Sequence, residues 1–131
     1  PMSGQALADE LASHRVYLTG SVNEPAGMHH VEGALCGLPI IYRSSGALPE
    51  YCDGFGIEFA GPDDLSAVLE RMMVEYDRWR AALEKYPHTA ERMCREYIEL
   101  FERLVSERDE IAVRRRLWRE PWTVLRNQVP L

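Results

Sequence analysis

The stretch that decides the fold runs from residue 24 to residue 42 and reads Glu24-Pro-Ala-Gly-Met-His-His-Val-Glu32-Gly-Ala-Leu-Cys-Gly-Leu-Pro-Ile-Ile-Tyr42. Its first half predicts a loop that leads into a helix over residues 28–36, with Gly27 permitting close backbone approach to a ligand. Its second half predicts a helix end at Gly37. A buried parallel strand over 39–42 follows, because that run lacks polar alternation. The order of loop, helix and buried strand is typical of α/β folds.

Two carboxylates, Glu24 and Glu32, stand on either side of the predicted turn into the helix. We expect Glu32 to lie about two turns along the helix, in a largely buried segment where an idle acid would be costly. A helix N-terminus offers free N–H groups and a partial positive charge, which suit a diphosphate. Carboxylates accept hydrogen bonds from sugar hydroxyls. This combination indicates a pocket for a nucleotide sugar.

The flanking sequence predicts the other elements of an α/β domain. Apolar periodicity and β-prone runs predict helices over residues 4–13 and 48–51 and strands over 16–19 and 56–59. Helical spacing then runs from Leu65 to Leu83 until Pro87 breaks it, and a last helix capped by Thr89 continues to about residue 110. Three parallel strands form only part of a doubly wound sheet, whose ligands bind at the carboxyl ends of the strands.

Length and composition are those of one globular domain: 131 residues, 46% hydrophobic and 27% charged. The formal net charge of −6 argues against general nucleic-acid binding. This charge is uneven, because residues 1–110 carry a net −10 and residues 111–131 a net +4. Nucleic acid is therefore not an expected partner.

The cysteines and the hydropathy pattern indicate the cellular compartment of the protein. Cys36, Cys52 and Cys94 are widely spaced and include no Cys-x-x-Cys pair, so we expect reduced thiols and no metal site. No apolar run approaches the roughly 20 residues of a membrane span. The start of the chain shows no signal-peptide pattern. We therefore expect a cytoplasmic protein.

Four elements, in the same order, resemble the nucleotide-sugar-binding C-terminal domain of retaining GT-B glycosyltransferases. They are a Glu-x7-Glu segment with Glu24, Gly27 and Glu32, then Cys36-Gly37-Leu38-Pro39-Ile40-Ile41, then Ser45-Gly46-Ala47-Leu48-Pro49-Glu50, and then Gly54-Phe55-Gly56. The sequence departs from the family pattern at Ala26, where Phe is frequent, and at Ser45-Gly46, where Gly-Gly is usual.

The resemblance implies a role for each residue of this segment. Glu24, the candidate catalytic residue, would hydrogen-bond the donor sugar, and Glu32 would hold the two ribose hydroxyls. Further substrate-binding residues, acting through backbone N–H groups or as the loop beside the nucleotide, would be Ala26, Gly27, Met28, His29, Ser45 and Gly46. The alternative interpretations are solvated acids and ordinary turn chemistry. The donor that the resemblance implies is a nucleotide-diphosphate sugar, and it implies neither a metal nor an organic cofactor.

The resemblance also implies a fold class and an activity. We expect an α/β, Rossmann-like parallel sheet, about half of a GT-B C-terminal domain, followed by long C-terminal helices. The partial nucleotide-sugar-binding domain would cover residues 1–110. The implied activity is transfer of the sugar with retention to a glycan or other acceptor bound by an N-terminal domain, so this chain alone would be inactive. A non-catalytic nucleotide-sugar-binding or interaction module and a sugar-nucleotide epimerase are the alternatives.

Residues 111–131 form a predicted basic arm that contains Arg114–Arg116, Trp118 and Trp122. Pro121 argues against one long amphipathic helix. We expect the tryptophans to pack on a partner domain, and peripheral membrane contact is the alternative.

Overall fold

The computed structural model describes residues 2–115 and Trp122. Contacts divide the chain into two compact units, Pro1–Thr89 and Ala90–Leu131. The domain boundary expected after residue 110 stays a prediction. Of the predicted arm, residues 116–121 and 123–131 lie outside the described residues, so its packing stays a prediction.

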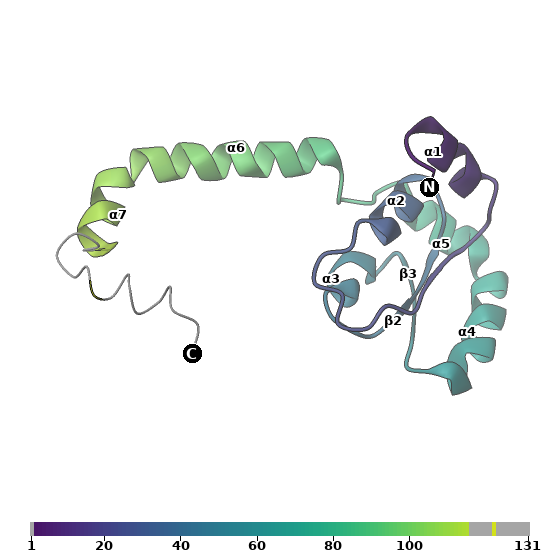
Figure 1. Cartoon of the computed structure of the whole chain (residues 1–131). Coiled ribbons are helices and arrows are strands. Elements are labelled where there is room, and N and C mark those ends of the chain that lie inside the picture. The colour runs from purple at the N-terminus through teal and green to yellow at the C-terminus, as the bar shows by residue number, and fades with distance from the viewer. Residues whose placement is uncertain (1, 116–121, 123–131) are drawn as a thin grey trace. The chain divides into compact units, whose positions relative to one another are not determined.

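Helices and strands alternate along the first unit as far as α4 (Pro62–Val74), and the described elements of the second unit are helices (Figure 1). In chain order the elements are α1 (Gln5–Ala12), β1 (Tyr17–Thr19), α2 (His29–Leu35), β2 (Ile40–Arg43), α3 (Leu48–Cys52), β3 (Gly56–Phe59), α4 (Pro62–Val74), α5 (Tyr76–Leu83), α6 (Ala90–Ser106) and α7 (Arg108–Arg115).

The first unit is built on a three-stranded parallel sheet in the order β1-β2-β3. Ile40 of the central strand pairs with Tyr17 on one side and Gly56 on the other. Parallel strands need crossover connections, and α2 and α3 supply them. These features confirm the expected α/β class with a parallel sheet followed by C-terminal helices.

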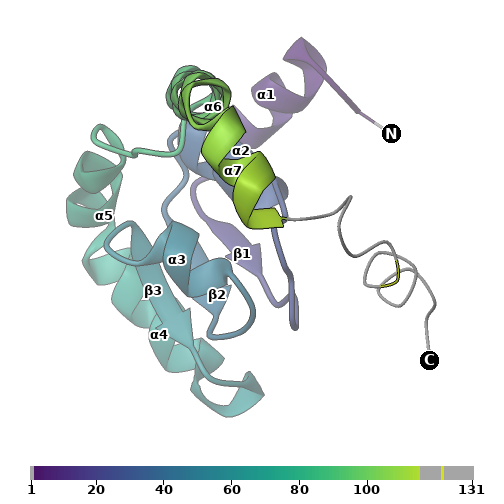
Figure 2. The ribbon, with the colours of Figure 1, turned by 90° about the vertical axis from the view of Figure 1, so that its left-hand side faces the viewer.

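Hydrophobic clusters cover both faces of the sheet because successive side chains of β2 point to opposite faces. Ile40 packs in one cluster with Val31 of α2 and Leu48 of α3. Ile41 packs in the other with Met72 of α4. Accordingly, α3 and α4 lie on opposite faces in Figure 2. This two-sided burial explains why the β2 sequence is apolar throughout.

Helix α2 ends in the glycine turn that the sequence predicts at Gly37. Gly37 has φ +82° and donates its N–H to the Ala34 carbonyl at 2.9 Å, while Leu38 donates to the Gly33 carbonyl at 3.1 Å. These paired bonds satisfy the last carbonyls of the helix and turn the chain toward β2. The end of α2 and the start of the central strand are therefore fixed by one local motif.

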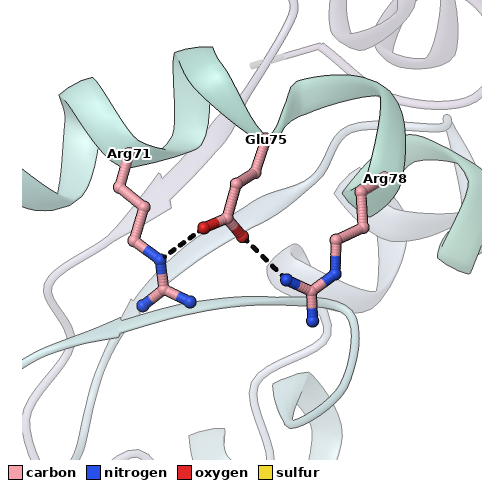
Figure 3. Close-up of polar contacts among 3 residues, drawn as sticks. All are labelled: Arg71, Glu75 and Arg78. Atoms are coloured by element: carbon pink, nitrogen blue, oxygen red, sulfur yellow. Dashed lines mark hydrogen bonds and ion pairs between the residues drawn. The ribbon is translucent and has the colours of Figure 1, made fainter.

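The single helix expected from Leu65 to Leu83 is wrong at Glu75, where the structure has two helices, α4 and α5. Glu75 adopts φ −96° and ψ 12°. Its carboxylate accepts hydrogen bonds from Arg71 Nε at 2.8 Å and from Arg78 Nη1 at 3.0 Å (Figure 3). The apolar spacing gives no sign of this break, because the apolar residues before and after Glu75 keep the spacing of one continuous helix.

Helices α6 and α7 are the described elements of the second unit, and α6 has no buried residue. The break between them at Glu107 again divides a stretch that the sequence predicts as one helix. Within residues 2–115 and at Trp122, no helix is both long and apolar enough to cross a membrane.

Candidate functional site

Two loops emerge at the carboxyl edge of the sheet, where β1 and β2 end. Strand β1 ends at Thr19 and leads into the loop over residues 20–28, which contains Glu24. Strand β2 ends at Arg43 and leads into the loop over residues 44–47. Because β1 and β2 are parallel neighbours, both loops leave the same edge, where open α/β sheets bind their ligands.

Hydrogen bonds and close packing join these two loops. The N–H of Asn23 donates to Ser45 Oγ at 2.9 Å, and the N–H of Ala47 donates to the Glu24 carbonyl at 2.9 Å. Gly46 lies directly against the Glu24 backbone, since a Cβ at residue 46 would collide with the Glu24 carbonyl oxygen. Three of the predicted site residues, Glu24, Ser45 and Gly46, are thus brought together by the fold.

Gly27 lies between the side chains of Glu24 and His29. A Cβ at residue 27 would lie 2.9 Å from Glu24 Cδ and 3.0 Å from His29 Nε2. Both side chains are half-buried. A glycine at this position therefore lets the backbone lie directly against a carboxylate group and an imidazole without a collision.

Tyr17 of β1 holds the other side of the His29 ring. Its hydroxyl lies 3.1 Å from His29 Nδ1, and the two rings stack with centroids 5.9 Å apart. Gly33 makes room for the Tyr17 ring, because a Cβ there would lie 2.7 Å from Tyr17 Cδ2. Burial, followed by the negative charge of Glu32, raises the pKa of Tyr17, so its hydroxyl stays protonated at neutral pH.

Glu32 is placed differently from the expectation. Helix α2 begins at His29, so Glu32 lies in its first turn and not two turns along. Its side chain is exposed, while its neighbours Val31 and Gly33 are buried. The argument from the cost of burying an idle acid therefore does not apply. An exposed carboxylate is accessible to a ligand, and without a ligand it is hydrated at no energetic cost.

The remaining predicted residues surround the start of α2. Ala26 and Met28 are exposed, and Met28 is the N-cap of the helix. The N–H groups of a first helical turn have no partner within the helix. Backbone contacts from this segment to a ligand stay a prediction, because the side chains here give no further indication of one.

His30 is a buried residue that is not among the predicted site residues. Its side chain is 1% exposed, and among the described residues neither ring nitrogen has a hydrogen-bond partner. The ring packs edge-on against Tyr51, with centroids 5.3 Å apart. Burial lowers the pKa of His30, and the neighbouring imidazoles of His29 and His88 act in the same direction, against Glu24.

Sequence reasoning missed Tyr17 and Asn23 as parts of the site. Tyr17 reads only as one residue of a short β-prone run, and nothing local shows that its hydroxyl reaches a helix twelve residues later. Asn23 has φ +54°, a backbone conformation that Asn tolerates better than most residues. An Asn before the first Glu was therefore the available signal for a sharp turn.

A comparison with curated proteins finds a similar protein in Schizosaccharomyces pombe. The chain is 29% identical over 107 residues to that organism's phosphatidylinositol N-acetylglucosaminyltransferase gpi3 subunit. The match covers 80% of this chain and 23% of that protein, so the chain spans about a quarter of the relative's length. No protein-family profile matches the chain, and no solved structure does. The chain is thus similar to part of a glycosyltransferase subunit.

Proposed function

We propose that this chain is the donor-binding part of a glycosyltransferase that uses a nucleotide-diphosphate sugar. The observation that carries the proposal is the packing of Gly46 on the backbone of Glu24, which joins the two motif-bearing loops at the carboxyl edge of the sheet. Similarity to a glycosyltransferase subunit supports the same reading.

Each residue takes a role that its chemistry suits. The Glu24 carboxylate accepts a hydrogen bond from a hydroxyl of the donor sugar, and the exposed Glu32 carboxylate accepts hydrogen bonds from the ribose hydroxyls. The N–H groups around Gly27 and Met28 approach the diphosphate, where they oppose the negative charge that develops as the glycosidic bond breaks. Ser45 and Gly46 border the nucleotide.

The carboxylates act by orientation and not by proton transfer. Holding the donor in one geometry lowers the barrier by removing freedom that a mobile donor would have to lose. Transfer with retention of configuration, and an acceptor bound by residues outside this unit, complete the proposal. The relative's length leaves ample sequence for such an acceptor site.

Calorimetric titration of the chain with UDP, GDP, ADP and their glucose conjugates tests the proposal. We expect at least one nucleotide and its glucose conjugate to bind. Glu32→Ala should weaken that binding about tenfold, because the charge-assisted hydrogen bonds from the ribose hydroxyls are lost. Glu70→Ala, which removes an exposed carboxylate from α4, serves as the matched control and should bind as the unmodified chain does. Absence of binding to all six compounds would contradict the proposal.

A further inference from the structure

Gly27 packs against one hydrogen-bond acceptor, the Glu24 carboxylate, and one ring nitrogen of His29. Glu24 Cδ and His29 Nε2 lie 2.9 Å and 3.0 Å from the same point, the Cβ position of residue 27. Glu24 Cδ and His29 Nε2 are therefore at most about 6 Å apart, a distance that one bridging polar atom can span. Among the described residues they form neither a hydrogen bond nor an ion pair with each other.

Tyr17 and Glu24 together select the tautomer of His29. If Nδ1 carried the proton, the lone pair of Nε2 would face the acceptor-only carboxylate, which is unfavourable. If Nε2 carries the proton, the Tyr17 hydroxyl donates to Nδ1 across the observed 3.1 Å. The raised pKa of Tyr17 keeps that hydroxyl a donor. The arrangement therefore favours an Nε2–H that faces the side of Glu24.

We propose that the His29 side chain donates its Nε2–H to a hydroxyl of the donor sugar that simultaneously donates to the Glu24 carboxylate. This inference rests on the proposed function and names a side-chain contact within that site. A hydroxyl is the group that accepts one hydrogen bond and donates another. One bridging oxygen, about 2.9 Å from a ring nitrogen and about 2.7 Å from a carboxylate oxygen, spans the separation of His29 and Glu24.

The tautomer is testable without any ligand. Nitrogen-15 NMR of the histidine rings distinguishes Nε2–H from Nδ1–H, and we expect His29 of the whole chain at neutral pH to be the Nε2–H form. Tyr17→Phe removes the hydroxyl and should give a mixture of the two forms. A predominant Nδ1–H form in the unmodified chain would overturn the inference while leaving the proposed function standing.

Binding of the sugar is tested by comparing each nucleotide with its glucose conjugate. His29→Phe keeps the backbone N–H and the ring stacking but removes the donor. We expect it to weaken binding of the nucleotide sugar about tenfold and to change binding of UDP, GDP or ADP less than about twofold. His14→Phe, at an exposed histidine paired with Glu10, should change neither.

A second variant keeps the test independent of ring packing. His29→Gln restores an N–H donor, and it should bind the nucleotide sugar more tightly than His29→Phe does. Equal losses for nucleotide and nucleotide sugar in His29→Phe, or no advantage of Gln over Phe, would overturn the role of His29 alone. Failure of the unmodified chain to bind any of the six compounds would overturn the proposed function together with this inference.

Discussion

The backbone of Glu24 occupies the space that a side chain at Gly46 would need. Gly46 has φ +60°, and a Cβ at this position would collide with the Glu24 carbonyl oxygen and lie 2.6 Å from the Glu24 nitrogen. Together with the bonds that involve Asn23 and Ala47, this contact holds the backbone of the first motif glutamate against the neighbouring loop. The position of Glu24 thus depends on a glycine in another loop.

Replacing Gly46 with Ala should destabilise the first unit by about 2–3 kcal/mol, since the left-handed backbone alone costs roughly 1–2 kcal/mol and the collision adds to it. Gly54→Ala is the matched control, because Gly54 has φ +81° but nothing within 4 Å of its Cβ position. Urea denaturation of the two variants separates backbone strain from loop packing. Equal losses would show that the contact with Glu24 is unimportant.

Gly27→Ala should displace the side chains of Glu24 and His29 while sparing the fold. The new Cβ would meet the ends of movable side chains, which can shift at low cost. We expect the free energy of unfolding to change by less than about 1 kcal/mol, the ordinary range for such a site. Binding of a nucleotide sugar should fall at least about tenfold. Gly20→Ala is the control, because nothing lies within 4 Å of its Cβ position. Unchanged binding of the nucleotide sugar by Gly27→Ala would contradict a binding site at Gly27.

His30 should make the chain less stable as the pH falls from about 7 to about 5. Its folded-state pKa is lowered chiefly by burial. The unfolded chain therefore takes up a proton near pH 6.5 that the folded chain does not, and stability is lost below that pH. His30→Phe should flatten this part of the pH profile of the unfolding free energy. An identical profile for His30→Phe would contradict the assignment.

The contacts of Glu75 at the break between α4 and α5 should stabilise the fold less in acid. The hydrogen bond from Arg71, with the positive charges of Arg71 and Arg78, lowers the pKa of Glu75. A lowered carboxyl pKa contributes stability that is present above its ordinary range, near 4.3, and lost as the pH falls through the folded value. Glu75→Gln should therefore lose less stability than the unmodified chain on acidification. An equal loss of stability in Glu75→Gln and the unmodified chain on acidification would contradict this prediction.

The order of strands and helices was predictable because local signals set it. Gly37 ends α2 through a positive φ and paired backbone bonds, and the apolar run at Ile40 and Ile41 marks a strand buried on both faces. These features depend on residues close in sequence. The break at Glu75 was not predictable from apolar spacing, because the arginines that bind its carboxylate read as ordinary charges on a helix surface.

Only part of the candidate site was predictable for a similar reason. The motif indicates Glu24, Gly27 and Gly46 by residue type and spacing. The exposure of Glu32 and the contact of Tyr17 with His29 depend on where α2 begins and how it packs on β1. Such tertiary relationships leave no periodic trace in the sequence.

The central claim is that a nucleotide sugar binds where the Glu24 loop meets the Ser45–Gly46 loop. Chemical-shift mapping of the nitrogen-15-labelled chain with UDP-glucose, GDP-glucose and ADP-glucose tests it most directly. We expect one of them to shift the backbone amide signals of Gly27, Met28, Ser45 and Gly46 and to leave those of α6 unchanged. Shifts confined to other residues, or none with all three compounds, would contradict it.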